Sequence, residues 1–356
     1  MKANLAIRAF VVLAFVGCIF QHQNRIEKEP IIITLWYGEC QEFGNIGLPQ
    51  KWINIPGNVT AADGISSLTY KLNQGESNKL TLGSDLHRLA AEGDFNIDLK
   101  VADCLEGENH VLIEALDALG NKTSKLLKIN VTKQKSWPLP YQIDWSEVNN
   151  IQEVVQVVDG QWQITKDGVS NIDVYYDRVL AFGDNSWENY EVFTTVTFHD
   201  FTPPIKGPPT YNVSHAAIAT RWPGHDADDL QPHRKWFPLG ATAEFRLTKD
   251  LDSCRWRIFD GPKPDTKNFH VEQSVEEYRN IELNKVYGMK HRVETIGKDS
   301  TMYSVKLWPI LEQEPAGWDF QGVEEDENVA KGSALLLAHN TKVTFGNIFV
   351  TPIKTE

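Results

Sequence analysis

Short runs of β-branched and aromatic residues, separated by turn clusters, follow one another along most of this chain. Residues 31–37 form such a run, and residues 67–72 alternate between polar and apolar side chains. Turn-forming residues such as Pro56-Gly57-Asn58 separate the runs. Alternation with a period of two is typical of a half-buried strand, and helical periodicity is scarce. The pattern predicts an all-β fold built from antiparallel sandwiches.

A hairpin-like segment ends the first part of the chain. Two strand-like runs at residues 110–116 and 126–131 flank the sequence Asp-Ala-Leu-Gly-Asn at residues 117–121. This order resembles the closing hairpin of bacterial immunoglobulin-like and cadherin-like domains. The resemblance implies a sandwich of about seven short strands at residues 31–133. It is nearly silent on function, so we expect this domain to be a spacer.

The second part of the chain has longer strand-like runs. A stiff Trp-Pro-Leu-Pro sequence at residues 137–140 predicts a linker at 134–140, because proline restricts itself and its neighbour. The order of the strand-like sequence motifs at residues 187–192, 287–294, 303–309 and 343–350 resembles that of the laminin-G-like, concanavalin A-like jelly roll. The resemblance implies a two-sheet jelly-roll domain at 141–353. Lectins, hydrolases, lyases and adhesion modules share this fold, so it does not imply a function.

The N-terminus has the composition of an export leader. Basic residues precede an apolar run at residues 9–20, which is shorter than the about 20 residues that a spanning helix needs. We expect a signal peptide at 1–20 and a linker at 21–30. Val16-Gly17-Cys18 also resembles the end of a bacterial lipobox, which makes Cys18 a candidate for lipidation. Cleavage without lipid and a retained leader stay open.

These alternatives share one consequence for location. We expect the protein to be exported, either to the outside or to the cell envelope, with only its leader or lipid in contact with a membrane. An oxidising compartment would permit a Cys40–Cys104 disulfide. Cys254 lacks nearby partners for nucleophilic chemistry, so we interpret it as a buried structural thiol.

Charge and composition restrict the partners. The formal net charge of −13 argues against nucleic acid, whose affinity comes largely from Lys and Arg contacts to phosphate. An acidic polysaccharide would need a local basic patch. The count of 11 Trp is high, and exported sugar-binding proteins place some Trp on their surfaces. We therefore expect carbohydrate or another cell-surface ligand as the partner.

The most unusual polar stretch lies at residues 221–238, between two predicted strands. Loops on a rigid sandwich often carry binding residues. Aromatic faces could stack on sugar rings, and basic side chains could bind a carboxylate or sulfate, or serve as acid and base. The candidates are Arg221, Trp222, His225, His233 and Trp236. The alternative is that the Trp residues pin the loop to the core while the charges are solvated.

The same loop contains three carboxylates. Ca²⁺ prefers several oxygen ligands, so Asp226, Asp228 and Asp229 are weaker candidates for a calcium site. No other cofactor is suggested by the sequence.

A second candidate surface lies on a pair of predicted strands. Alternation puts Lys290, Arg292 and Glu294 on one face, opposite to His291. Such a face suits an acidic glycan, and Tyr303 on the next strand is a further candidate. A polysaccharide lyase needs a positive group near the uronate and a base such as Tyr or His. An outward, salt-bridged face is the alternative.

Hydrolase signatures are missing from the sequence. Family-16-type hydrolases on this fold carry Glu-x-Asp-x-Glu or Glu-x-Asp-x-x-Glu on one strand, and nothing here matches. We therefore predict a non-enzymatic, exported surface or envelope protein that binds carbohydrate or another extracellular ligand through its jelly roll. A polysaccharide lyase or other carbohydrate-active enzyme, and a purely structural envelope component, are the alternatives.

Overall fold

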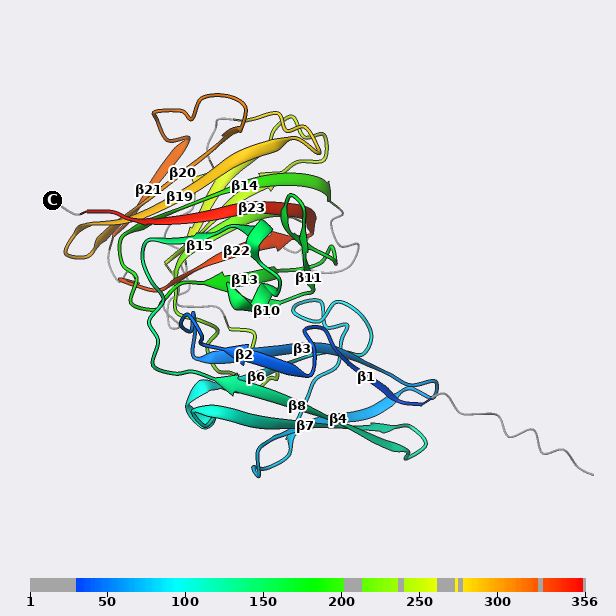
Figure 1. Ribbon diagram of the computed structural model, residues 1–356. Coiled ribbons are helices and arrows are strands. Elements are labelled where there is room, and N and C mark those ends of the chain that lie inside the picture. Colours follow the sequence, from blue (N-terminus) through cyan, green and yellow to red (C-terminus); the bar gives the residue numbers. More distant parts are fainter. Residues whose placement is uncertain are drawn as a thin grey trace, which may run out of the picture.

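The computed structural model describes residues 30–201, 213–235, 240–260, 273–274, 278–325 and 329–354. Regular structure in these ranges consists of strands and three short 3-10 helices, so the predicted all-β fold is confirmed (Figure 1). No helix in the described ranges is long and apolar enough to cross a membrane. The predicted leader at 1–20, Cys18 and most of the linker at 21–30 lie outside the described residues.

The first sandwich consists of a three-stranded and a five-stranded sheet. The smaller sheet has the order β1 (Ile32–Leu35), β3 (Trp52–Thr60), β6 (Asp94–Lys100). The larger has the order β2 (Cys40–Phe43), β8 (Lys122–Val131), β7 (Gly107–Asp117), β4 (Ile65–Leu72), β5 (Asn78–Lys79). The short helix η1 (Val101–Asp103) follows β6. Alternation along β7 buries Val111, Ile113 and Ala115 between the sheets.

The second sandwich consists of a seven-stranded and an eight-stranded sheet. The first has the order β10 (Gln156–Asp159), β13 (Arg178–Phe182), β22 (Ser333–His339), β15 (Ser214–Trp222), β16 (Ala241–Leu247), β17 (Arg255–Asp260), β18 (Gln273–Ser274). The second has the order β11 (Trp162–Thr165), β12 (Gly168–Asn171), β23 (Thr341–Pro352), β14 (Tyr190–Phe201), β19 (Val286–Gly297), β20 (Ser300–Pro309), β21 (Phe320–Glu325), and β9 (Tyr141–Ile143) pairs with β23. Two short helices, η2 (Trp145–Glu147) and η3 (Ile151–Glu153), lie between β9 and β10.

The seven-stranded sheet lies between the eight-stranded sheet and the first sandwich (Figure 1). Every residue of β15 and β22 is buried, because both faces of these strands are covered. Along β14, by contrast, Tyr190, Val192 and Val196 face the core and alternate with partly exposed residues. The predicted domain boundaries, including the linker at 134–140, stay predictions.

Polar side chains of β3 and β6 form the contact with the second sandwich. They alternate with the apolar residues that face the first core, and Asn54, Asn96 and Asp98 are at most 2% exposed. Asn54 accepts a hydrogen bond from Gln156 Nε2 at 2.7 Å, and Asn96 donates to the Val158 carbonyl at 2.7 Å. The outer face of the three-stranded sheet is therefore a buried interface joined by hydrogen bonds, although Asn96 Oδ1 has no partner among the described residues.

Arg88 is the charged centre of this interface. Its guanidinium donates to Asp98 in its own sandwich at 2.7 Å, and to Asp159, the Val158 carbonyl and the His233 carbonyl in the other. The side chain is 4% exposed and both carboxylates are fully buried. Burial alone would lower the pKa of Arg88, but the two carboxylates raise it overall, so the guanidinium stays charged.

The predicted Cys40–Cys104 disulfide is wrong, because both thiols are free. Alternation along β2 turns Phe43 into the core and Cys40 outward. Cys104 lies in the core after η1, where its Sγ is 3.7 Å from the Lys100 carbonyl, and burial raises its pKa to about 11. Cys254 is fully buried in the second sandwich, as predicted.

We expect Arg88→Met to lower the free energy of unfolding by about 3–5 kcal/mol, because it leaves Asp98 buried without its cation and removes from Asp159 the cation that bonds to it. Lys51→Met is the matched control, since the Lys51–Asp226 pair crosses the same interface with side chains 47% and 43% exposed. An exposed pair contributes less than about 1 kcal/mol. Urea denaturation followed by Trp fluorescence measures both. Equal losses would contradict the role of Arg88.

Candidate functional site

Arg221, a predicted ligand-binding residue, is fully buried at the end of β15. Its guanidinium donates to the Glu188 carbonyl at 2.9 Å, to Thr301 Oγ1 at 2.8 Å and to Thr295 Oγ1 at 2.7 Å. Burial lowers its pKa. Trp222 is also fully buried, in an apolar cluster on the outer face of the seven-stranded sheet. Arg221 therefore joins the two sheets, Trp222 packs on the opposite face of the seven-stranded sheet, and neither side chain faces solvent.

The loop that follows is held by the first sandwich. Trp52 Nε1 donates to the His225 carbonyl at 2.7 Å, and the Trp52 ring packs on the His233 ring at 4.3 Å. The His233 backbone N–H donates to Asp98 at 2.8 Å. Burial lowers the pKa of His225 well below its usual value. Trp236 lies outside the described residues, and the two histidines are parts of the interface.

The three carboxylates of the loop are bound to different groups. Asp226 pairs with Lys51 at 3.1 Å, and Asp228 accepts the backbone N–H of Arg234 at 2.9 Å. Asp229 is exposed. Among the described residues, none of the three belongs to a group of carboxylates and histidines close enough to share a metal ion. The structure does not bring the calcium candidates together.

Lys290, Arg292 and Tyr303 do not share a face. Arg292 is directly opposite Ser304 in the β19–β20 pair, so Tyr303 has the other orientation. Tyr303 is fully buried and donates to Glu324 at 2.8 Å. Lys290 and Arg292 lie on the outer face of the eight-stranded sheet. The set that a lyase would need is therefore not assembled here.

His291 faces the core between these two cations. It is fully buried, and its Nδ1 donates to the Ile218 carbonyl at 2.9 Å, across the space between the two sheets. Burial lowers the pKa of His291 to about 4, although the bond to Ile218 opposes this. A neutral imidazole therefore links β19 to β15.

The outer face of the eight-stranded sheet carries two rows of side chains. These two rows and the rings of Trp308 and Trp318 form what we call the outer-face patch. The first row, across β23, β14, β19 and β20, consists of Phe349, Phe193, Lys290 and Lys306. The second row, which continues onto β21, consists of Thr351, Glu191, Arg292, Ser304 and Gln321. One row is aromatic and cationic, and the other is polar.

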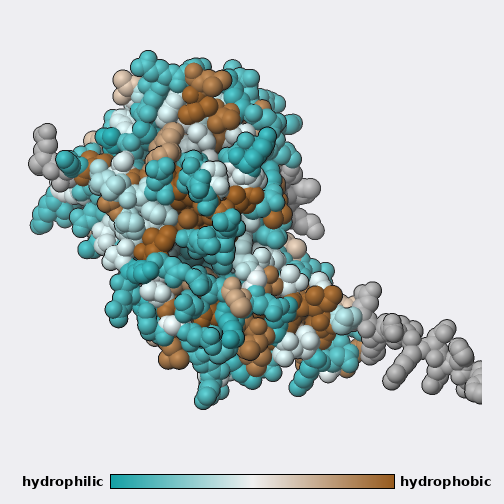
Figure 2. All heavy atoms as spheres, viewed as in Figure 1, coloured by the Kyte–Doolittle hydropathy of each residue, from teal (hydrophilic) through white to brown (hydrophobic). Residues whose placement is uncertain are grey.

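Three aromatic rings lie side by side in this patch. Trp308 lies against Gly288, where an added Cβ would come 2.5 Å from its ring. Its ring stacks with Phe193 at 5.7 Å and an angle of 19°, and Phe193 is 6.0 Å from Phe349. Trp308 is buried, whereas Phe193 is half-buried and Phe349 is 37% exposed. Figure 2 shows apolar surface on this sandwich as separate spots among polar residues.

Trp318 brings a fourth ring onto the patch from the segment between β20 and β21. Arg292 lies 5.0 Å and Lys306 4.7 Å from its ring centroid, within the range of a cation–π contact. The Lys306 ammonium also donates to the Pro315 carbonyl at 2.7 Å. Trp318 is half-buried, so part of its ring remains open to solvent.

Two carboxylates balance the cations. Glu191 accepts from Arg292 at 2.8 Å and lies 3.0 Å from Lys290. Glu314 contacts both Lys290 and Lys306 at 2.7 Å. Burial opposes the effect, but the two lysines hold the pKa of Glu314 below its usual value. The Arg292 side chain is 36% exposed, more than either lysine.

Sequence reasoning found Lys290 and Arg292 but missed the rings beside them. On β20 the even-numbered residues face outward and the odd-numbered ones face the core, so Trp308 and Lys306 belong to the patch and Tyr303 does not. Aromatic content along the strand was a visible signal. Which of the β20 residues lie beside Lys290 and Arg292 depends on the register between β19 and β20, and the sequence does not show this register.

No family model matches this chain, and a search of curated proteins finds none that matches it. Solved structures match parts of it. The carbohydrate recognition domain of Emp46p, metal-free, is 7% identical over 59% of this chain and 95% of its own, with a TM-score of 0.40. The exoplasmic/lumenal domain of VIP36, bound to Ca²⁺ and Man3GlcNAc, is 9% identical over 56% of this chain and 85% of its own, with a TM-score of 0.35.

An endo-β-1,4-mannanase from Thermotoga petrophila is 13% identical over 30% of this chain, with a TM-score of 0.23. This chain spans only 20% of that enzyme. At such identities and scores, function has to be inferred from the residues of this chain.

The buried His291 predicts a pH dependence of stability. The pKa of His291 is about 4 in the folded protein and 6.5 in the unfolded chain. As the pH falls, the unfolded chain is therefore protonated at this residue before the folded protein is. Stability is therefore present above pH 6.5 and is lost as the pH falls toward 4. Between pH 7 and pH 5, protonation of His291 in the unfolded chain lowers the free energy of unfolding by about 2 kcal/mol.

His291→Gln should lose about 2 kcal/mol less stability than the wild type over that interval. Urea denaturation at pH 7 and pH 5 gives the change in unfolding free energy with pH for each protein. This change can be compared even if the variant is less stable at pH 7. His110→Gln is the control, since this His is 42% exposed. Equal slopes for wild type and His291→Gln would show that His291 does not titrate as argued.

Proposed function

We propose that this chain is an exported carbohydrate-binding protein that holds its ligand on the outer-face patch. The observation that carries the proposal is Trp318, a half-buried ring contacted by Arg292 and by Lys306, whose ammonium also lies 5.7 Å from the Trp308 ring centroid. Sugar rings present apolar C–H faces that pack on aromatic side chains. Ligand sites generally combine such rings with a few polar groups that fix orientation.

The polar row supplies groups for sugar hydroxyls. Arg292 offers donors, Glu191 offers acceptors, and Ser304 and Gln321 are already bonded to each other at 2.8 Å. Hydroxyl groups both donate and accept, so a row of mixed donors and acceptors suits them. The second row therefore complements the aromatic one.

Charge favours an acidic glycan over a neutral one. The patch has three cations, Lys290, Arg292 and Lys306, and two carboxylates, Glu191 and Glu314, which leaves one positive charge. Glu294 lies just beyond the patch on the same face, two residues from Arg292, and the whole chain has a net charge of −13, so the positive charge is local to the patch. Complementary charge steers association and adds specificity.

Export and the spacer role belong to the same proposal. The apolar run at residues 9–20 and the basic residues before it support export. The buried contacts around Arg88 support a first sandwich that presents the second one at a fixed angle. The ligand would then bind on the face that points away from the first sandwich.

Trp318→Ala should weaken glycan binding about tenfold, the effect of losing about 1.4 kcal/mol. Leu311→Ala is the matched control, because Leu311 lies on the same segment and is 98% exposed. A panel of neutral and uronate-containing glycans, titrated by calorimetry, identifies the ligand. Arg292→Gln should weaken uronate binding more than neutral glycan binding.

Three outcomes would contradict this proposal. Wild-type protein that binds nothing on the panel would favour a structural role. Equal affinities for Trp318→Ala and Leu311→Ala would place the ligand elsewhere. Unsaturated uronate in the reaction mixture would reveal a lyase.

A further inference from the structure

The seven-stranded sheet carries a second group of polar residues, on the side remote from the outer-face patch. In the strand register His215 is directly opposite both His339 and Arg246, and Asp177 lies just before β13, which pairs with β22. Asp177, His339 and His215 thus meet at one level of the sheet. His215 and His339 are 5% and 4% exposed.

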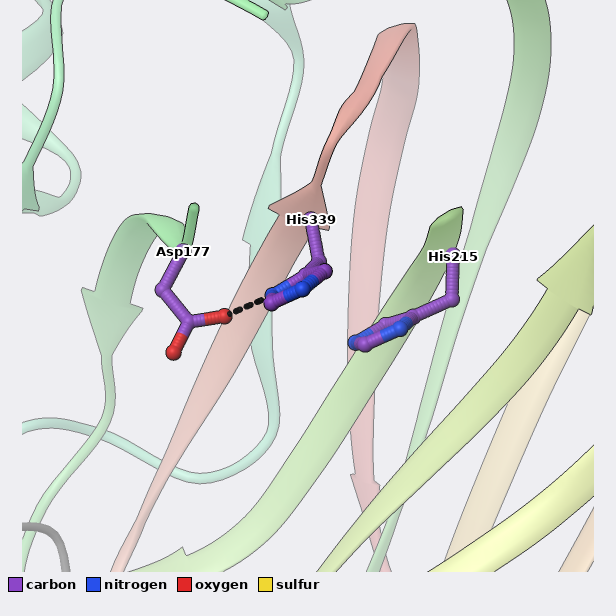
Figure 3. Close-up of side chains that lie close together, drawn as sticks. All are labelled: Asp177, His215 and His339. Atoms are coloured by element: carbon purple, nitrogen blue, oxygen red, sulfur yellow. Dashed lines mark hydrogen bonds and ion pairs between the residues drawn. The ribbon is translucent and has the colours of Figure 1, made fainter. Parts of the chain in front are cut away.

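The geometry of this cluster is tight (Figure 3). Asp177 Oδ1 and His339 Nδ1 are 2.6 Å apart. The His339 and His215 rings are nearly parallel, with 4.6 Å between centroids and an angle of 4°. On its other side, His215 Nε2 lies 3.9 Å from Glu244 Oε1.

One nitrogen on each ring is left over. His215 Nδ1 and His339 Nε2 are both buried, and neither has a hydrogen-bond partner among the described residues. A buried polar atom without a partner costs about 1–3 kcal/mol, so such atoms call for an explanation. In each ring the other nitrogen faces a carboxylate, Asp177 or Glu244.

We propose that His215, His339 and Asp177 bind one divalent transition-metal ion of the zinc type. Two imidazoles and one carboxylate are a common ligand set for such ions. One ligand atom from each of the three residues lies within 4.8 Å of the others. Bonds of about 2.0–2.1 Å place tetrahedral ligand atoms about 3.3 Å apart. The ion therefore requires side-chain rotations that bring His215 closer and turn His339 away from Asp177, from which its Nδ1 is now 2.6 Å.

The surrounding charges are compatible with a cation. Arg246 and Arg257 lie near His215, but both are paired with Glu244, at 2.7 Å and 3.6 Å. The Asp177 carboxylate remains as the negative ligand, and it also interacts with the buried guanidinium of the neighbouring Arg178. Imidazole nitrogen suits zinc, copper, nickel or iron, whereas Ca²⁺ takes oxygen ligands, so this site differs in kind from the calcium site predicted on the loop.

Three protein ligands leave a fourth coordination position, as in catalytic zinc sites. The inference is independent of glycan binding, because the two sites lie on different sheets. It also assigns a role to His215 and His339, which take no part in the proposed glycan site.

The test uses full-length protein without an affinity tag, stripped with a chelator and dialysed. Titration with Zn²⁺ and with Co²⁺ should show one equivalent bound, and Co²⁺ should give the visible absorption of a low-coordinate site. Excess Ca²⁺ should not compete. His339→Ala and His215→Ala should each weaken Zn²⁺ binding at least tenfold, whereas His110→Gln should bind as the wild type does.

Asp177→Asn serves as a second variant should the histidine variants not fold, because it keeps the size of the side chain and removes its charge. It should also weaken Zn²⁺ binding. Wild-type protein that takes up no stoichiometric metal would overturn the proposal and point to a buried water at the two nitrogens. Unchanged binding in folded His215→Ala or Asp177→Asn would overturn it as well.

Discussion

The arrangement of this molecule depends on buried, charged contacts between its two sandwiches, with Arg88 at their centre and Arg178 beside it. Arg88 reaches Asp98 on its own sandwich and Asp159 on the other, and all three side chains are almost fully buried. A buried charge tolerates little displacement from its partners, because losing one leaves the other uncompensated. The pairing fixes the angle between the sandwiches, covers one side of the seven-stranded sheet, and leaves the eight-stranded sheet facing outward (Figure 1).

This interface explains why the sequence predicts the fold class better than the role of the loop at 221–238. Alternation predicts that the odd-numbered residues of β6, such as Phe95 and Ile97, face a core, and they do. The same pattern predicts solvent for Asn96 and Asp98, which are instead buried against the second sandwich. A single strand cannot distinguish a solvated face from a polar interface, because both select polar residues.

The site shows a similar limit. Lys290 and Arg292 are recognisable from alternation within β19, but Lys306 and Trp308 join them only through the register of β20. His215 and His339 are still harder to connect. They are distant in sequence and meet because β15 and β22 are neighbours in a sheet whose order does not follow the chain. Local sequence patterns predict individual strands. Which side chains meet in a cluster depends on which strands pair and in which register.

The two sites are physically connected through the core. His291, between Lys290 and Arg292 on β19, donates to the Ile218 carbonyl on β15, three residues from His215. This bond is directional and buried, so it sets the position of β19 relative to β15. The proposed ion would bind to the same strand, β15, to which His291 fixes β19. The outer-face patch is therefore attached to β15 by a bond through the core, whereas the spacing of its cations is set within β19 and by the pairing of β19 with β20.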